Sequence, residues 1–140
     1  MMSTQEVIPL DFSVSPRALV VDDDEALSSL LEFIFQRQGY VVDVLHDGLK
    51  ADEHISSDCV PPDVVILDIM LPRVDGFALL RKIRQKPSWK EVPVLMLSAL
   101  GDEQNIVRAL DAGANDYVQK PFKPEELKAR VRRLVRKSTH

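Results

Sequence analysis

The stretch ALVVDDDEAL, residues 18–27, decides how the rest of the chain is interpreted. Four apolar residues lead directly into Asp22, Asp23 and Asp24, and Glu25 follows them. Like charges placed side by side repel one another and are costly to remove from water. A strand that ends in this way indicates either a solvated turn or a site that supplies positive charge.

Four more short apolar runs follow along the chain: YVVDV (40–44), VVIL (64–67), VLML (94–97) and DYV (116–118). Stretches with helical spacing separate these runs, and two of the runs are apolar throughout, as strands covered on both faces are. Five strands that each precede a helix predict a parallel sheet with helices on both faces. Right-handed crossovers then favour an α/β, flavodoxin-like (βα)5 fold with the strand order 2-1-3-4-5.

Apolar residues at helical spacing predict which face of each helix is buried. The four faces are Leu27, Leu30, Leu31 and Ile34; Phe77, Leu80 and Ile83; Ile106, Val107 and Leu110; and Leu127, Val131, Leu134 and Val135. The remaining helix, around 49–55, has the weakest pattern. Asp24 and Asp75 are interpreted as helix N-caps, Gly39 as a C-terminal cap and Gly76 as a point of backbone freedom.

The composition is that of one globular domain, with 140 residues of which 45% are hydrophobic and 29% charged. We interpret residues 17–136 as the domain, 1–16 as an N-terminal extension that we expect to be flexible, and 137–140 as a C-terminal tail. No apolar run approaches the ~18 residues of a membrane span, and the first residues do not resemble a signal peptide. Together with a single cysteine, Cys59, these features favour a cytoplasmic protein without membrane contact.

The net charge of −4 is unevenly distributed, because residues 120–140 contain eight Lys or Arg and only two acids. The remaining body is acidic, which excludes a general affinity for nucleic acid. The basic last helix has an apolar face for the sheet and an arginine-rich face for solvent. It has no recognition-helix unit, so we expect no direct nucleic-acid binding.

Polar side chains follow four of the predicted strands, and the sheet order brings them together. Asp22 and Asp23 follow the first strand, Asp68 the third, Ser98 the fourth and Lys120 the fifth. The carboxyl ends of parallel strands meet at one edge of the sheet, and the winding reverses between the first and third strands. Carboxylates without His or Cys favour Mg²⁺, for which Mn²⁺ can substitute. A carboxylate, a hydroxyl and a lysine beside this metal predict phosphoryl transfer onto an aspartate.

The fragments VVDDDEAL, ILDIMLPRVDG and YVQKPF together resemble the receiver domain of two-component response regulators, over about residues 17–136. The resemblance implies that Asp68 is the phosphoacceptor and that its phosphoryl group comes from a sensor histidine kinase or a histidine phosphotransfer protein. It implies that Asp22, Asp23, Asp68 and the backbone carbonyl of Met70 form the metal site. Ser98 and Tyr117 match the switch residues, Lys120 matches the phosphate-binding lysine, and Lys120–Pro121 matches a cis peptide.

A receiver of this kind catalyses its own phosphorylation and slow dephosphorylation, so we expect a switch and not a conventional enzyme. The resemblance implies that phosphorylation changes the surface made by the last two helices and the strand between them. In the transcription-factor branch of the family this surface also forms a symmetric homodimer, with acids meeting basic residues. Four residues resemble that pattern: Asp111, Asp116, Arg130 and Arg132. A solvated basic face is the competing interpretation.

Two other functional classes fit parts of the sequence. A Mg²⁺-dependent phosphatase of the haloacid-dehalogenase type would use Asp22 as its nucleophile, since Asp22 and Asp24 satisfy its D-x-D pattern. Such an enzyme leaves Asp68 without a role. A flavin-binding module is excluded because carboxylates after the first strand would repel the flavin phosphate. The histidines have no metal-ligand spacing and are interpreted as surface residues: His46, His54 and His140.

Overall fold

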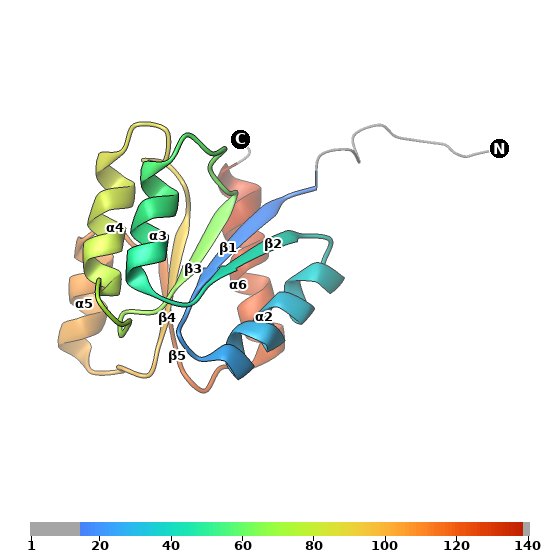
Figure 1. Ribbon diagram of the computed structural model, residues 1–140. Coiled ribbons are helices and arrows are strands. Elements are labelled where there is room, and N and C mark those ends of the chain that lie inside the picture. The colour runs from blue at the N-terminus through green and yellow to red at the C-terminus, as the bar shows by residue number, and fades with distance from the viewer. Residues whose placement is uncertain (1–14, 139–140) are drawn as a thin grey trace.

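The computed structural model of the protein describes residues 15–138. Five parallel strands form one sheet: β1 Arg17–Val21, β2 Val41–Leu45, β3 Val64–Leu67, β4 Val94–Ser98 and β5 Asp116–Gln119. Their order across the sheet is β2-β1-β3-β4-β5, as predicted (Figure 1). Residues 1–14 of the expected N-terminal extension (1–16) lie outside the described residues. The last two residues of the expected C-terminal tail lie outside them as well.

In the described part of the chain, five helices cover the two faces of the sheet: α2 Glu25–Arg37, α3 Gly48–Ser56, α4 Gly76–Gln85, α5 Glu103–Asp111 and α6 Pro124–Ser138. Helices α3, α4 and α5 pack on one face, and α2 and α6 pack on the other (Figure 1). Within residues 15–138 no helix is long and apolar enough to cross a membrane.

The two hydrophobic cores follow from the alternation of side chains along each strand. In β1, Leu19 and Val21 face the core under α3, α4 and α5, while Ala18 and Val20 face the core under α2 and α6. All residues of β3 and β4 are buried, which is the pattern of strands covered on both faces. The apolar runs in the sequence therefore mark the centre of the molecule.

Three of the helices begin at an aspartate that caps them. Asp24 accepts a hydrogen bond from the Leu27 amide at 3.0 Å, and Asp75 accepts one from Ala78 at 2.9 Å. These two caps are confirmed. Asp47 caps α3 in the same way, with its carboxylate 2.7 Å from the Lys50 amide. Each carboxylate satisfies an amide that the helix leaves without a backbone partner and suits the positive end of the helix dipole.

The predicted buried faces are correct for α4 and α6 and wrong in part for α2 and α5. In α5 only Ala109 is buried, whereas Val107 and Leu110 are each 47% exposed. This helix packs at the β5 edge of the sheet. At such an edge, one small buried side chain is enough to hold the helix against the core. In α2 the buried residues are Ser28, Leu31 and Phe35, while the predicted Leu30 is 45% exposed.

Gly76 is the first residue of α4, and there is no space for a side chain at this position. A β-carbon at this position would lie 2.2 Å from the Asp68 carbonyl oxygen and 2.6 Å from the Ile69 Cα. The expectation of backbone freedom at Gly76 is therefore corrected, because the constraint is close contact with the loop after β3. The same loop contains Arg73, which has a left-handed backbone with φ 76°.

The amino end of the sheet, where the strands begin, is held by side chains that bind backbone. Trp89, in the loop that joins α4 to β4, is fully buried, and its ring meets the His54 ring edge-on at 6.0 Å. Arg84 donates to the carbonyl of Gly113 at 2.9 Å and to that of Val92 at 2.7 Å. It also donates to the side chain of Asn115 at 2.8 Å. These contacts tie α4, β4 and the turn before β5 into one unit.

Candidate functional site

The carboxyl end of β1 places two acids in different surroundings. Asp22 is 2% exposed, because the chain is still within the sheet where its amide donates to the Leu45 carbonyl at 3.1 Å. Asp23 comes one residue later and is exposed to solvent. The carboxylate of Asp22 accepts a hydrogen bond from the Asp24 amide at 3.0 Å. The acidic run therefore divides into a buried acid, an exposed acid and a helix cap.

Asp68 joins these acids from the neighbouring strand. Val21 pairs with Leu67 in the sheet register, so the residues that follow them emerge side by side. Asp68 is 5% exposed, and its amide donates to the Val21 carbonyl at 3.0 Å. One carboxylate oxygen from each of Asp22, Asp23 and Asp68 lies within 4.8 Å of the others. The predicted convergence of the strand ends is therefore present.

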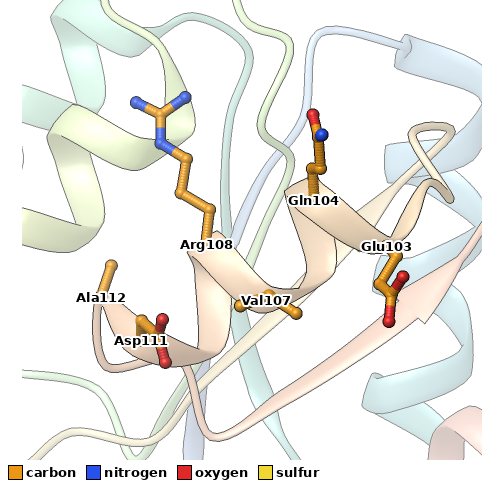
Figure 2. Close-up of a pocket in the computed structure, with 6 residues that line it drawn as sticks. All are labelled: Glu103, Gln104, Val107, Arg108, Asp111 and Ala112. Carbon is orange, nitrogen blue, oxygen red and sulfur yellow. The ribbon is translucent and has the colours of Figure 1, made fainter.

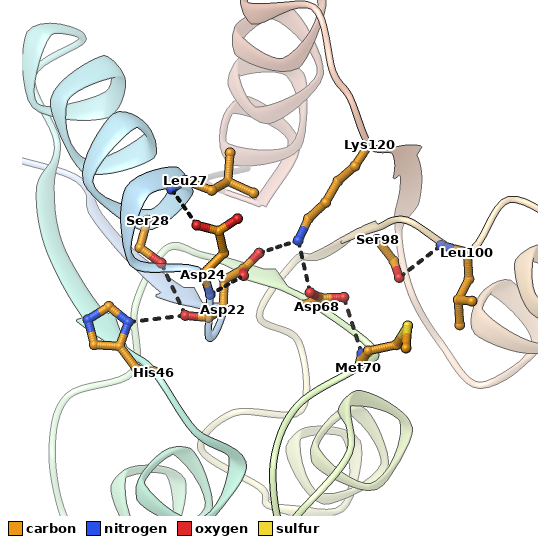
Figure 3. A network of polar contacts seen from close by, with 10 residues as sticks. All are labelled: Asp22, Asp24, Leu27, Ser28, His46, Asp68, Met70, Ser98, Leu100 and Lys120. Carbon is orange, nitrogen blue, oxygen red and sulfur yellow. Dashed lines mark hydrogen bonds and ion pairs between the residues drawn. The ribbon is translucent and has the colours of Figure 1, made fainter.

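Lys120 supplies positive charge to this cluster from the end of β5. Its Nζ lies 2.8 Å from Asp22 Oδ2 and 2.9 Å from Asp68 Oδ2 (Figure 3). The backbone amide of Lys120 donates to the Ser98 carbonyl at 2.8 Å, which fixes the start of the side chain. The peptide bond between Lys120 and Pro121 is cis, as the resemblance implies.

Burial and charge compete at the Asp22–Lys120 pair. Burial raises the pKa of Asp22 above its ordinary value, and the hydrogen bond from Lys120 offsets this only in part. Burial also acts to lower the pKa of Lys120, but the bonds to Asp22 and Asp68 outweigh it and raise that pKa. Lys120 is thus held in its charged form. The buried Asp22 carboxylate beside it is only partly neutralised, so further positive charge would stabilise it.

Ser98 and Tyr117 meet at the same residue of the loop that leads into α5. Ser98 is fully buried, and its Oγ accepts a hydrogen bond from the Leu100 amide at 3.3 Å. The Tyr117 hydroxyl donates to the Leu100 carbonyl. Burial raises the pKa of Tyr117, with a smaller opposing contribution from Ser98. The two side chains thus hold both polar backbone groups of Leu100.

Met70 borders the site through its backbone. Its amide donates to Asp68 Oδ1 at 3.2 Å, and its side chain is 57% exposed (Figure 3). The backbone of Met70 therefore lies beside the acidic cluster, and metal binding by its carbonyl stays a prediction.

The residues considered for a dimer face separate into different environments. Arg130 binds Asp116 of the same chain at 3.0 Å and also binds Glu126. Burial raises the pKa of Tyr40, and the positive charge of Arg132 partly opposes this, so Arg132 faces the residues that follow α2. Asp111 lines an open hollow of about 700 Å³ on α5. Figure 2 shows this hollow, which is lined by α5 and the residue after it and contains none of the strand-end residues of the acidic site.

Two residues that the sequence did not assign to the acidic site contact it. His46 is exposed, as expected of a surface histidine, but its Nδ1 lies 3.2 Å from the Asp22 carbonyl oxygen. Ser28 donates its hydroxyl to the same oxygen at 3.1 Å. No sequence pattern predicts either contact, because each depends on where α2 and the loop after β2 pack in the folded domain.

The family of response regulator receiver domains matches residues 18–132 of this chain. The chain is a member of that family. It is 42% identical over 123 residues to the DNA-binding dual master transcriptional regulator RpaA of Synechocystis sp. PCC 6803, covering 88% of this chain and 50% of RpaA. It is 43% identical to the phosphate regulon transcriptional regulatory protein PhoB of Rhizobium meliloti, covering 88% of this chain and 53% of PhoB. This receiver domain therefore spans about half the length of these curated relatives.

Solved receiver structures agree with this assignment. The receiver domain of Francisella response regulator 1452 aligns with a TM-score of 0.80 and 34% identity, over 88% of this chain and 98% of that one. The receiver domain of sensor histidine kinase PA1611 from Pseudomonas aeruginosa aligns with a TM-score of 0.78 and 30% identity, over 87% and 98% of the two chains. That structure has a magnesium ion coordinated in its active-site cleft. Membership of this family counts against the haloacid-dehalogenase alternative.

The side chains at the carboxyl end of this receiver's sheet suit a hard divalent cation. Three carboxylates meet there, and one of them is exposed to solvent while two are buried. A single lysine contacts two of the three carboxylates, which leaves an excess of negative charge. Oxygen ligands that include carboxylates are the ligands that Mg²⁺ prefers in proteins.

Proposed function

We propose that this receiver domain accepts a phosphoryl group on Asp68 from the phosphohistidine of a partner protein. A carboxylate oxygen of Asp68 forms the new O–P bond as the partner's P–N bond breaks. The electron pair of the broken bond returns to the imidazole nitrogen, which takes a proton from solvent. The product is an aspartyl phosphate, and the protein acts as a switch that is reset by slow hydrolysis.

The observation that carries this proposal is the position of Asp68 between a cation and two further acids. Lys120 contacts Asp68 at 2.9 Å and can hold an oxygen of the incoming phosphoryl group. Ser98 lies at the end of the next strand and can donate its hydroxyl to a second oxygen. Mg²⁺ held by Asp22, Asp23 and Asp68, with the carbonyl of Met70, would neutralise the charge that builds up during transfer.

We propose that Ser98 and Tyr117 pass the change at Asp68 to the surface formed by α5, β5 and α6. Both residues bind Leu100, so a displacement of Ser98 toward a phosphoryl group would alter the contacts of the loop before α5. Only Ala109 of α5 is buried, which leaves this helix with a small attachment to the core. A weakly attached helix next to the site is suited to a two-state change.

The phosphodonor would be a sensor histidine kinase or a histidine phosphotransfer protein. An apolar groove of about 520 Å³ runs beside Lys120, between the start of α2 and the segment that begins α6. Leu27 and Leu30 form one wall, and Pro121 and Phe122 contribute to the other. The exposure of Leu30 is explained by its place in this wall. A partner helix that carries phosphohistidine could rest here with its imidazole directed at Asp68.

Mass spectrometry after incubation with acetyl phosphate and Mg²⁺ tests the proposal. The wild-type protein should gain one phosphoryl group, and peptide mapping after reduction with borohydride should place it on Asp68. The Asp68→Asn variant should show no adduct, while removal of Mg²⁺ by a chelator should abolish it in the wild type. An undiminished adduct in Asp68→Asn, or one mapped to Asp22, would refute this assignment and favour the phosphatase-type nucleophile.

A further inference from the structure

The carbonyl oxygen of Asp22 accepts hydrogen bonds from two side chains on different elements. Ser28, from the second turn of α2, donates its hydroxyl at 3.1 Å, and this side chain is 1% exposed. His46, directly after β2, places Nδ1 at 3.2 Å. A carbonyl oxygen can only accept, so Nδ1 carries the proton and Nε2 is the other ring nitrogen. Figure 3 shows both side chains directed at this oxygen.

This carbonyl belongs to the peptide that joins Asp22 to Asp23. A peptide group is planar, so fixing its oxygen also fixes the direction in which the chain leaves toward Asp23. Asp22 itself has other restraints, since its amide binds Leu45 and its carboxylate binds Asp24 and Lys120. Within residues 15–138 the carboxylate of Asp23 receives no hydrogen bond or ion pair from the protein. Its position in the acidic cluster therefore depends on the backbone before it.

We propose that Ser28 and His46 are positioning residues that hold Asp23 in place as a metal ligand. They act through the Asp22 carbonyl and do not touch the metal or the phosphoryl group. Outer residues that orient metal ligands strengthen metal binding because they reduce the freedom that the ligands lose when the ion arrives. The inference rests on the proposed Mg²⁺ site, and it assigns to the loop after β2 a part in a site otherwise built from β1, β3, β4 and β5.

The proposal is tested by titrating the metal-free 140-residue protein with Mg²⁺ in a calorimeter, which requires no phosphoryl transfer. The two informative variants are His46→Asn, whose amide nitrogen takes nearly the place of Nδ1, and His46→Gln, whose amide nitrogen takes nearly the place of Nε2. His46→Gln should weaken Mg²⁺ binding by about threefold, while His46→Asn should stay close to the wild type. Ser28→Ala should weaken it by about three- to tenfold, because its hydrogen bond is buried.

Thermal unfolding without Mg²⁺ separates positioning from a general structural role. His46→Gln and His46→Asn should melt together in the absence of metal and diverge when Mg²⁺ is added. Equal Mg²⁺ affinity in His46→Gln, His46→Asn and the wild type would overturn the role of His46, and an equal loss in both variants would show that the Nδ1 donor is not what matters. A wild-type protein that binds no Mg²⁺ would instead overturn the proposed function itself.

Discussion

The two ends of the sheet are built on opposite principles. At the amino end, Arg84 and Lys86 donate to backbone carbonyls, and Trp89, in the loop that joins α4 to β4, is fully buried. At the carboxyl end, three acids lie together with one lysine for counter-charge. The backbone there includes a left-handed arginine, Arg73. One end uses its charged side chains to bind backbone carbonyls, and the other gathers more carboxylates than its one lysine can neutralise.

This difference teaches that stability and function are located apart in the same small domain. Substitutions at the amino end should change the free energy of unfolding and leave the acidic site intact. Substitutions at the carboxyl end should change the response to Mg²⁺ and leave the free energy of unfolding nearly constant, or raise it. The four predictions that follow test this contrast, from the largest expected effect to the smallest.

Replacing Trp89 by alanine should lower the free energy of unfolding by about 3–5 kcal/mol, because a large side chain leaves a cavity in the core. Urea unfolding monitored by circular dichroism measures this loss. Trp89→Phe is the matched control and should cost much less, since the indole Nε1 has no hydrogen-bond partner among residues 15–138 to lose. An alanine variant as stable as the wild type would contradict the proposed role of the amino end.

Replacing Asp22 by asparagine should not lower the free energy of unfolding of the metal-free protein, in contrast to the Trp89 variant. Burial raises the pKa of Asp22, so folding disfavours its charged form relative to the unfolded chain, and asparagine should leave the metal-free protein as stable as the wild type or more so. The stabilisation by Mg²⁺, about 2.7 kcal/mol at a concentration of 100 times Kd, should be lost. Melting temperatures with and without Mg²⁺ provide the measurement.

The same pair of proteins has a distinguishable pH dependence. Because the folded pKa of Asp22 is raised, its contribution to stability is fully present below the unfolded pKa and is lost as pH rises through the folded pKa. The difference in stability between the wild type and Asp22→Asn should therefore shift against the wild type as pH rises through the acidic range. A shift in favour of the wild type would show that Lys120 outweighs burial.

Replacing Arg73 by glycine should raise the free energy of unfolding by about 0.5 kcal/mol. The left-handed conformation costs a non-glycine residue about 1 kcal/mol, and glycine would relieve this strain. Glycine also makes the unfolded chain more flexible, which cancels part of the stabilisation. Arg73→Ala keeps the strain and should differ little from the wild type. If alanine and glycine are equally stable at this position, strain is not stored there.

The fold could be predicted because the sheet is parallel and central strands are apolar throughout. Runs such as VVIL and VLML are buried on both faces. Their side chains are therefore buried whichever face of the sheet each one points to. The convergence of Asp22, Asp68 and Lys120 followed from the same geometry, since the ends of parallel strands meet at one edge. The site was therefore predictable wherever a residue directly follows a strand.

The parts that failed depend on tertiary seating. The periodicity of α5 is the same whether Val107 and Leu110 face the core or solvent, and only the position of the helix over the β5 edge decides between them. Leu30 likewise fits a helical stripe but lies in the groove beside Lys120. The contacts of Ser28 and His46 with the Asp22 carbonyl join residues 6 and 24 positions apart. No local pattern encodes such contacts.

The absence of a side chain at Gly76 limits how this domain can be re-engineered. The start of α4 rests directly on the carbonyl of the residue proposed to be phosphorylated, with no room for even a methyl group between them. Residues of the intervening loop can be exchanged to alter charge or polarity, but the path of that loop cannot be widened. Libraries that diversify the loop should therefore hold position 76 constant and treat it as part of the site.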